Sequence, residues 1–479
     1  MELILQINSF INGIVWGPVM LFLLVGTGVY LTVRCGCLQA RKFGFMLRST
    51  LGSLFRKTEK TSGGQNLTPF QAVSTALAGT VGTGNIAGVT GAIFAGGPGA
   101  VFWMWVSAFF GMMTKYAEIV LAVKYRQVDG DGTHFGGPMY YIEKGTGHKW
   151  LAVLFALLGG VACFGIGNIA QSTEIAGAMQ SLVGLPPLYT GILLAILTAF
   201  VVIGGVKRIG QVASYLVPFM AIFYIVAGVS VILLRITDVP AVLASIFTEA
   251  FSFRAVGGGV FGYAILVAMR QGFARGVFSN EAGLGSAPMA HAASNTKEPV
   301  EQGLWGIFEV FVDTIIICTL TSMAVLLSGV LENDINSYGS NGAAAAAAFN
   351  SILPGTIGGT VLQISLLFFA LSTILGWSYY GERCWGYLTH NSKTANLIFK
   401  VAFVLVCVVG AVGSGSLMWD ISDTLNGMMA IPNLIGLLLL SGTVVQLTRP
   451  YFKDKKFWVK TSRGDRKCGP PGLPFRMVS

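Results

Sequence analysis

The sequence predicts an all-α polytopic membrane protein of about 11 transmembrane helices, ten of which form two inverted repeats of five. Three observations predict this class. The 479 residues are 53% hydrophobic and only 11% charged, whereas a soluble domain has about 25% charged residues. The chain contains a succession of apolar runs, most of them near the length of about 20 residues that crosses a bilayer. Two of these runs, five apart in chain order, are interrupted by glycine and polar residues.

The first apolar run lies near residues 9–33, and ten more follow it. They lie near residues 69–95, 98–124, 150–179, 187–206, 211–235, 257–292, 303–330, 355–380, 395–413 and 424–447. We expect residues 1–450 to form a single integral membrane domain. Residues 451–479 are rich in Lys and Arg, and we expect them to form a basic cytoplasmic tail with a disordered end.

The loops between the runs alternate in charge. Lys and Arg are concentrated after the first run, after the eleventh run and near residues 124–149, 207–208 and 383–400. The loops near residues 95–98, 180–187, 331–354 and 414–423 carry none. Cytoplasmic loops of membrane proteins carry an excess of Lys and Arg. The alternation therefore predicts an N-terminus outside and a C-terminus in the cytoplasm, and it explains the net charge of +10 without a nucleic acid partner.

The second run carries glycines at positions 79, 82, 84, 88 and 91, with Thr80, Thr83, Asn85 and Thr90 between them. Glycine costs a helix about 1 kcal/mol relative to alanine, so we expect this run to break within the membrane. Irregular backbone at that depth is stable only when it is buried in protein or lines a watery cavity. Its free N–H groups would bind an anionic group and its free C=O groups a small cation. The alternative is close helix packing through small residues.

The seventh run is interrupted as well. It contains Gly257-Gly-Gly259 and, further on, a segment at residues 268–285 in which glycine and charged residues break the apolar pattern. Two interrupted spans in corresponding positions of two halves indicate a transporter binding site. Because five is an odd number, the second half would enter the membrane from the opposite face. Runs two to six and seven to eleven would then form an inverted repeat, with run one outside it.

Several polar side chains in the runs are candidates for ligand binding. The amides of Asn85 and Gln171 would bond a zwitterionic ligand, or merely a neighbouring helix. The hydroxyls of Ser372 and Thr373, if they face free carbonyls of the first break, would form an oxygen cage of the kind that hard cations prefer. The alternative is that both hydroxyls bond carbonyls of their own helix. Trp377 would close over a small ligand, or pack within the bundle.

Charged residues inside a membrane are costly and often mark functional sites. Arg275 and Glu281 flank the second break, and we interpret them as gating residues that stabilise the inward-closed state. Glu174 lies one turn from Gln171. Its carboxylate either couples transport to a cation or faces a loop.

Other classes of function find no support in the sequence. Gly82-Thr-Gly84 is not followed by Gly-Lys-Ser/Thr, so it is not a nucleotide-binding loop. The seven cysteines and four histidines show no metal-ligand spacing, and no Ser-His-Asp group can be placed. We therefore expect a protein that is not an enzyme and has no cofactor.

Six strings of the sequence carry a family resemblance. They are GTGNIAGV (82–89), GGPGAVFWMW (96–105), TKYAE (114–118), GGPMYY (136–141), GNIAQ (167–171) and SNEAGLGSAPMAH (279–291). Together they resemble the alanine or glycine:cation symporter (AGCS) family, the bacterial and archaeal sodium:alanine symporters, over about residues 10–450. The resemblance implies a LeuT-like fold, with ten core helices in two inverted repeats. It also implies a multi-pass protein of a prokaryotic plasma (inner) membrane.

The resemblance further implies symport of a small neutral amino acid, alanine or glycine, with sodium as the coupling ion, by alternating access. The substrate carboxylate would meet backbone amides of the first break, and aromatic rings would confine the substrate side chain. The residues implied to contact substrate are Thr83, Gly84, Asn85, Gln171, Phe273, Gly276 and Trp377. By analogy to the wider fold, the residues that would bind sodium are Thr80, Gly82, Ser372 and Thr373.

Three alternatives stay open at this point. One keeps the transporter but replaces sodium with protons, and Glu174 and Asp313 make that possible; Glu174 stands where an uncharged residue is expected. A second is an ion channel with the glycine breaks as its filter, although the sequence shows no suitable ring of repeated segments. The third is a membrane receptor that uses the same fold for binding only. The oligomeric state is left open.

Overall fold

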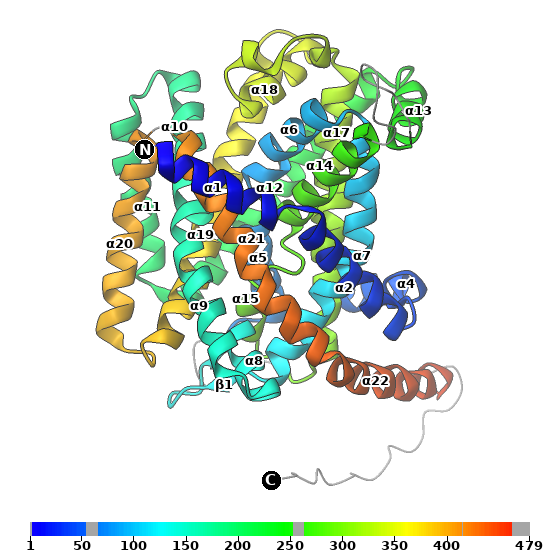
Figure 1. The fold of residues 1–479 in the computed structure, drawn as a ribbon, viewed down its shortest axis with the longest axis vertical. Helices are drawn as coiled ribbons and strands as arrows, with labels where there is room; N and C mark the ends of the chain where they lie inside the picture. Colours follow the sequence, from blue (N-terminus) through cyan, green and yellow to red (C-terminus); the bar gives the residue numbers. More distant parts are fainter. Residues whose placement is uncertain (1, 54–65, 252–262, 414, 462–479) are drawn as a thin grey trace.

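Apolar runs in lipid have no water to bond their backbone, and a helix satisfies its N–H and C=O groups within a single run. The computed structural model describes residues 2–53, 66–251, 263–413 and 415–461, and most of them are helical (Figure 1). The helices of the first half are α1 (Glu2–Val15), α2 (Pro18–Arg34), α3 (Leu38–Arg41), α4 (Phe43–Thr50), η1 (Leu51–Ser53), α5 (Pro69–Thr80), η2 (Thr83–Asn85), α6 (Ala87–Gly96), α7 (Gly99–Lys124), α8 (Pro138–Thr146), α9 (Lys149–Phe164), η3 (Gly165–Ile169), α10 (Ala170–Val183), α11 (Pro187–Val202), α12 (Gly205–Leu234) and α13 (Val239–Ala250).

The second half continues with a similar succession of long and short helices. They are α14 (Tyr263–Asn280), α15 (Pro288–Ala292), α16 (Pro299–Val310), η4 (Phe311–Cys318), α17 (Thr319–Leu327), η5 (Val330–Glu332), η6 (Ile335–Tyr338), α18 (Asn341–Ile352), α19 (Ile357–Leu388), α20 (Lys393–Val412), α21 (Gly415–Leu439) and α22 (Ser441–Thr461). The segments η3 and η4 are π-helical turns within longer helices. Strands β1 (Gln127–Val128) and β2 (His134–Phe135) form a short antiparallel hairpin between α7 and α8.

Seven helices of the described chain are long and apolar enough to cross a membrane, and the number rises to nine if each bent pair counts as one span. The bent pairs are α5 with η2–α6, which turn by 59°, and α21 with α22, which turn by 57°. Each of the eleven predicted runs contains helix, and α11 is a shorter apolar helix within the run at 187–206. The predicted all-helical membrane fold is confirmed. Gly257-Gly-Gly259 lies outside the described residues.

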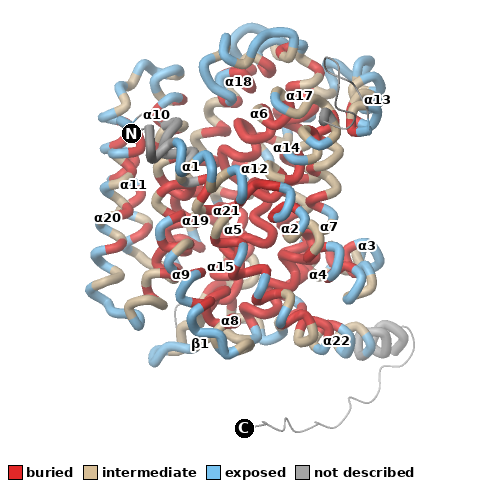
Figure 2. Tube along the Cα trace, viewed as in Figure 1, coloured by how far each residue is buried: buried red, intermediate tan, exposed pale blue. Residues whose placement is uncertain are grey.

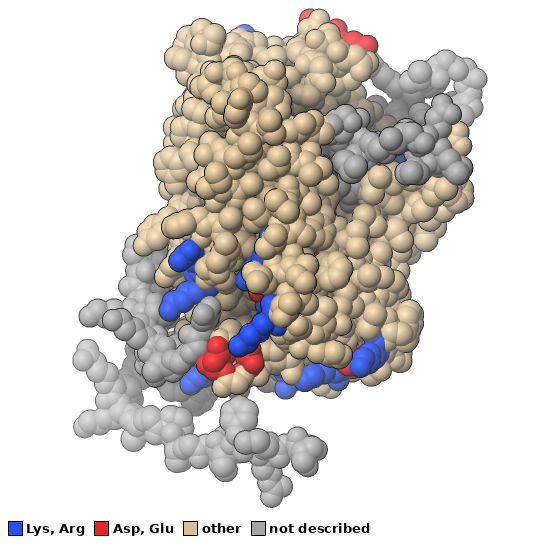
Figure 3. Space-filling view, turned by 90° about the vertical axis from the view of Figure 1, so that its left-hand side faces the viewer, with Lys and Arg blue, Asp and Glu red and all other residues tan. Residues whose placement is uncertain are grey.

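The outside of the bundle is apolar. Phe200 on α11, Tyr215 on α12 and Leu405 on α20 are among its exposed large side chains. Buried residues are concentrated in the centre, and exposed residues line the outer side of α20 (Figure 2). Figure 3 shows a broad uncharged belt on one face, with most of its Lys and Arg side chains gathered toward one end. An apolar belt with charges gathered beyond it suits a protein that passes through a bilayer several times.

The helix α22 turns away from the bundle at its lower end in Figure 1. The predicted boundary at residue 450 falls inside this helix, which runs from Ser441 to Thr461. The first part of the expected tail is therefore the end of a helix. Residues 462–479 lie outside the described residues.

Candidate functional site

The first break, between α5 and α6, leaves backbone groups without partners. The amide of Gly82 donates to Oδ1 of Asn85 at 2.9 Å. Within the described residues, the amides of Thr83 and Gly84 donate to no protein atom, and the carbonyls of residues 78–81 accept no hydrogen bond. Buried backbone groups are almost always paired. A ligand is the natural partner for groups left open inside a membrane bundle.

Asn85 uses its side chain to hold this break in place. Its Nδ2 donates to Oγ of Ser279 at 2.8 Å and to Oδ1 of Asp313 at 2.6 Å. Its backbone amide lies 3.2 Å from the carbonyl of Gly82, and its carbonyl accepts from the hydroxyl of Thr321 at 2.8 Å. The structure therefore brings Asn85 to the site, but as a crosslink between the first break, α14 and η4.

The second break separates α14, which ends at Asn280, from α15, which begins at Pro288. Glu281, Gly283 and Gly285 have φ values of 55°, 95° and 83° there. This left-handed region is open to glycine and uncommon for other residues. The predicted interruption of the seventh run is thus present, and it follows the last turn of α14.

Side chains from two other helices replace the missing helical hydrogen bonds of the second break. Oε1 of Glu118 on α7 accepts from the amide of Gly283 at 3.1 Å. Nδ2 of Asn433 on α21 donates to the carbonyl of Gly283 at 2.9 Å and to Oε1 of Glu118 at 2.6 Å. The break is therefore a fixed, fully buried structure, as the membrane interior requires.

Gly84 allows the two breaks to touch. A Cβ added to Gly84 would lie 3.1 Å from the ring of Phe278 and 3.9 Å from Cα of Ser279. The absent side chain at position 84 lets the free amides of the first break lie beside the last turn of α14. The first break therefore lies against the last turn of α14, which leads into the second break.

Gln171 and Trp377 approach the second break from the other side. The π-helical turn η3 leaves the carbonyl of Ile166 to accept from Nε2 of Gln171 at 3.0 Å. Oε1 of Gln171 is buried, with no hydrogen-bond partner in the described part of the chain. A Cβ added to Gly167 would lie 2.4 Å from Cβ of Trp377. Nε1 of Trp377 in turn donates to Oε1 of Glu281 at 2.9 Å. The indole thus lies between η3 and the second break.

Ser372 and Thr373 lie on α19 beside the first break. Both hydroxyls donate to the carbonyl of Phe369, at 2.8 and 2.9 Å. A Cβ added to Gly82 would lie only 2.5 Å from Oγ1 of Thr373. Each hydroxyl donates its proton to Phe369, so its lone pairs remain available. Those of Thr373 lie at Gly82, next to the free carbonyls of residues 78–81. The donor set is entirely oxygen, which fits a hard cation such as sodium.

Three of the predicted residues face elsewhere. The ring of Phe273 packs against Trp103 of α7, with 5.4 Å between centroids. A Cβ added to Gly276 would lie 2.3 Å from Oγ of Ser107, also on α7. These two positions share a face of α14 that packs on α7, so the structure does not bring them to the breaks. The hydroxyl of Thr80 donates to Glu309 at 2.8 Å.

The two predicted gating residues do not contact each other. Nη1 of Arg275 lies 3.7 Å from Oδ1 of Asp423 on α21, and its guanidinium lies 5.4 Å from the ring centroid of Phe278. Nδ2 of Asn12 on α1 donates to the other oxygen of Asp423 at 3.1 Å. In chain order α14 follows α13 and leads into the second break. Arg275 therefore lies before this break, in the part of the chain nearer to α13. Glu281 lies within the break itself.

Comparison with known proteins decides the family. The chain matches the sodium:alanine symporter family over residues 1–463. The chain belongs to this family. It is 48% identical over 460 residues to the sodium/alanine symporter AgcS of Methanococcus maripaludis, covering 95% of this chain and 99% of that protein. It is 37% identical over 455 residues to the probable sodium/glutamine symporter GlnT of Bacillus subtilis, covering 95% and 92% of the two chains.

A solved structure shares the fold. The crystal structure of MhsT in complex with L-phenylalanine matches with a TM-score of 0.54 at 17% identity, covering 79% of this chain and 97% of that one. The LeuT-like fold implied by the resemblance is therefore present. Family membership makes this chain a sodium-coupled amino acid symporter and not an enzyme.

A buried polar network lies next to the breaks of this symporter. Nζ of Lys115 lies 3.2 Å from Oε1 of Glu309, and Nε2 of His291 lies 3.1 Å from Oε2 of the same carboxylate. His291 is also bonded through Nδ1 to Gln302 at 2.8 Å. Glu309 accepts from Thr80 at the end of α5. The network therefore ties both interrupted spans to α7 and α16.

The two carboxylates considered for proton coupling lie in different surroundings. Asp313 accepts from Asn85, from Ser279 at 2.8 Å and from Thr314 at 2.8 Å, so it lies at the junction of the two breaks. Glu174 lies against α18, where a Cβ added to Gly342 would be 3.1 Å from its Oε2. Only Asp313 is part of the site.

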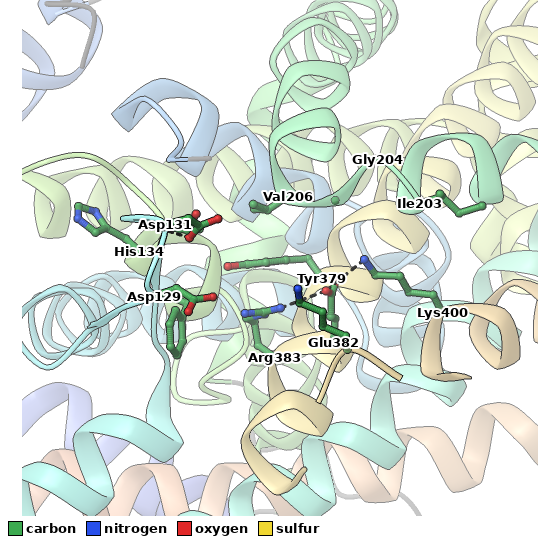
Figure 4. Close-up of a pocket in the computed structure, with 14 residues that line it drawn as sticks. Asp129, Asp131, His134, Ile203, Gly204, Val206, Tyr379, Glu382, Arg383 and Lys400 are labelled. Atoms are coloured by element: carbon green, nitrogen blue, oxygen red, sulfur yellow. Dashed lines mark hydrogen bonds and ion pairs between the residues drawn. The ribbon is translucent and has the colours of Figure 1, made fainter. Parts of the chain in front are cut away.

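A cavity of about 390 Å³ opens near the β1–β2 hairpin, between the α11–α12 turn and the last turns of α19 (Figure 4). Nη2 of Arg383 and Nζ of Lys400 lie 3.1 and 3.2 Å from Oε1 of Glu382, and the guanidinium of Arg383 lies 5.4 Å from the ring centroid of Tyr379. Burial lowers the pKa of His134 from its ordinary value of 6.5, so its ring is neutral at pH 7. The cavity is polar and distinct from the breaks.

Sequence reasoning overlooked several residues of the site. Phe278 and Ser279 lie beside Gly84. The family string at residues 279–291, which begins at Ser279 and directly follows Phe278, is the sequence signal that could have pointed to them. Asp423 is an acidic residue at the edge of a loop without Lys or Arg.

Proposed function

We propose that this chain imports a small neutral amino acid, alanine or glycine, together with sodium, by alternating access across a prokaryotic plasma membrane. One observation carries the proposal. The first break presents free amides at Thr83 and Gly84 and free carbonyls at residues 78–81, and Oγ1 of Thr373 lies against Gly82. A single short segment therefore offers donors to a carboxylate and acceptors to a cation.

The substrate carboxylate would bind at Thr83 and Gly84, at the start of η2 and α6. The amides at a helix N-terminus carry a partial positive charge that favours an anion. Gln171 would add a polar contact, and Trp377 would confine the substrate side chain. Phe278, which lies over Gly84, would take the role first assigned to Phe273. The close contacts at Gly84 and Gly167 leave little room beside the substrate, which favours the small side chains of alanine and glycine over that of glutamine.

Sodium would bind between the carbonyls of the first break and the hydroxyls of Ser372 and Thr373. Sodium and substrate would then order the same stretch of backbone from its two sides. Such coupling is reciprocal, so sodium raises the affinity for substrate by the factor by which substrate raises the affinity for sodium. This shared backbone is the physical basis that we propose for symport.

Alternating access is supported by two cavities on opposite sides of the buried breaks. One is the cavity of about 390 Å³ at the hairpin end. The other has about 110 Å³ and is lined by Asn12, Trp16, Arg270, Gln271, Ala274, Arg275 and Asp423. With the N-terminus outside and the C-terminus in the cytoplasm, the smaller cavity would be the outer mouth. The Arg275–Asp423 pair, rather than Arg275 with Glu281, would close it.

A second candidate is coupling to protons through Asp313, since this buried carboxylate bonds both breaks. Binding measurements separate the two cations. If sodium is the coupling ion, alanine raises the unfolding temperature of the purified protein only when sodium is present, at any pH between 6 and 8. If protons couple transport, alanine stabilises the protein without sodium, and more strongly at the lower pH.

The sodium cage is tested with matched variants on one helix. Thr373→Ala and Ser372→Ala each remove a proposed ligand, so we expect the sodium concentration for half-maximal alanine binding to rise about tenfold, which corresponds to about 1.4 kcal/mol. Ser365→Ala is the control, because Ser365 is buried on α19 and donates to its own helix at Val361. Equal sodium requirements in all three variants would contradict the cage.

A further inference from the structure

Glu281 is a buried carboxylate held in a strained backbone conformation. It follows the last residue of α14, is 3% exposed and has a φ of 55°. The other non-glycine residues with positive φ in the described chain are Cys37, His390 and Asn391, which lie in turns between helices. Left-handed conformations of non-glycine residues cost free energy and cluster at binding sites. The fold therefore places the Glu281 carboxylate within the second break at a cost.

The carboxylate of Glu281 makes no direct ion pair with any residue that the structure describes. Oε1 accepts from Nε1 of Trp377 at 2.9 Å and Oε2 accepts from Oγ of Ser286 at 2.5 Å. Among the described residues, no Lys, Arg or His nitrogen lies within 4.0 Å of Glu281, because the nearby Lys115 pairs with Glu309. A carboxylate can accept about four hydrogen bonds, so Glu281 keeps capacity for another donor. A buried carboxylate without a cation is strongly disfavoured.

The end of α14 adds to the negative charge at this place. Among the described residues, the carbonyls of Ser279 and Asn280 accept no hydrogen bond. Free carbonyls at a helix C-terminus carry a partial negative charge that attracts cations. Glu118 lies close by and bonds the amide of Gly283. The second break is therefore a site of negative charge, whereas the first break offers positive amide dipoles.

A second, independent observation comes from α10. Oε1 of Gln171 is buried and accepts no hydrogen bond from any residue that the structure describes. It belongs to the same wall as Trp377, since Gly167 lies against that indole. Oε1 of Gln171 and the carbonyls of Ser279 and Asn280 are all acceptors. Their complement is a ligand group with several N–H donors and a positive charge, and an ammonium group has three donors.

We propose that the carboxylate of Glu281 binds the α-ammonium group of the transported amino acid. This assignment rests on the proposed function, in which the free amides of Thr83 and Gly84 bind the substrate carboxylate. A Cβ added to Gly84 would lie 3.9 Å from Cα of Ser279. The carboxylate and the ammonium group of one α-amino acid therefore reach both breaks. Glu281 is then a substrate-binding residue that selects zwitterions over simple carboxylates.

The test compares alanine with lactate, in which a hydroxyl replaces the ammonium group. Competition against labelled alanine is measured on purified, reconstituted protein in saturating sodium, for the unchanged chain, Glu281→Gln and Glu143→Gln. We expect Glu281→Gln to weaken alanine binding about 30-fold, in the range for a charged hydrogen bond, and to leave lactate within about threefold. Glu143→Gln changes a partly buried carboxylate on α8 that accepts from the hydroxyl of Tyr387, away from the breaks, and it should keep the preference for alanine.

Two results would overturn the assignment. One is an unchanged ratio of alanine to lactate affinity in Glu281→Gln. The other is a raised sodium requirement with that ratio unchanged, which would make Glu281 a sodium ligand. If Glu281→Gln does not fold, Glu281→Asp tests the assignment instead, because it keeps the charge but moves the carboxylate away from the substrate by one methylene. It should reduce the ratio about fivefold, a loss of about 1 kcal/mol, and an unchanged ratio would reject the proposal. Failure of the unchanged chain to bind alanine with sodium would instead refute the proposed function.

Discussion

A methyl group at position 82 would collide with the hydroxyl of Thr373, since a Cβ there lies 2.5 Å from Oγ1. We expect Gly82→Ala to displace Thr373 and raise the sodium concentration for half-maximal uptake by about tenfold. Gly177→Ala is the control, because a Cβ at Gly177 on α10 meets no atom within 4 Å. The measurement is alanine uptake by the two variants as a function of sodium concentration. Equal half-maximal sodium concentrations in the two variants would place the cation elsewhere.

Asn85 should matter for stability. Asn85→Ala removes the hydrogen bonds to Asp313, Ser279 and the amide of Gly82, so buried polar groups would be left unpaired. We expect a loss of about 3 kcal/mol of stability, read as a lower midpoint of thermal unfolding without ligand. Asn85→Asp should be at least as harmful, because it places a second carboxylate against Asp313. An unchanged midpoint in Asn85→Ala would show that the crosslink is dispensable.

At this scale the sequence predicted the first break but not the hydrogen bonds that hold it. The glycine density around residues 79–91 identified the break, because glycine in an apolar run has a direct backbone consequence. It did not reveal that Asn85 bonds Asp313, which is 228 residues away. Tertiary hydrogen bonds depend on which helices become neighbours, and no local pattern encodes that.

The helix α14 has two functional faces. Phe273 packs on Trp103 of α7, whereas Phe278 lies over Gly84 of the first break. We therefore expect Phe273→Leu to lower thermal stability by about 1 kcal/mol and to leave the half-saturating alanine concentration unchanged. Phe278→Leu should raise that concentration. The pair is compared by unfolding and by alanine binding at saturating sodium, and the reverse pattern would restore the role first given to Phe273.

The two faces could not be assigned from the sequence alone. Phe273 and Phe278 flank the same glycine-rich segment and are chemically identical. Which ring faces the break is set by the rotation of α14 against α7, where Gly272 and Gly276 let the two helices approach closely. Small residues at a helix–helix interface give the same sequence pattern as small residues at a binding site. This is the physical reason why Gly276 was placed in the pocket.

The orientation of the whole molecule is open to a test with a native cysteine. Cys37 follows the first span and is exposed, whereas Cys163, Cys318, Cys384 and Cys407 are buried. We predict a cytoplasmic position for Cys37, from the Lys and Arg that follow the first run. A membrane-impermeant maleimide should therefore label the protein only after the cells are permeabilised. Labelling of Cys37 in intact cells would reverse the topology.

The fold as a whole followed from a few global features of the sequence. Run length, low charge and two interruptions five runs apart are long-range patterns that the membrane imposes directly. The expected boundary at residue 450 lies inside α22, which runs to Thr461. The end of a polar helix lacks the apolar signal that marks a span, so it cannot be read from hydropathy.

The central claim is that sodium drives uptake of a small neutral amino acid at the two breaks. The most direct measurement is uptake of labelled L-alanine into proteoliposomes under an imposed inward sodium gradient, with an imposed proton gradient as the control. We predict uptake with the sodium gradient, none with the proton gradient, and loss of uptake in Gln171→Ala and Thr373→Ala but not in Ser365→Ala. Uptake driven by protons alone, or no sodium-driven uptake of alanine or glycine by folded protein, would contradict this account.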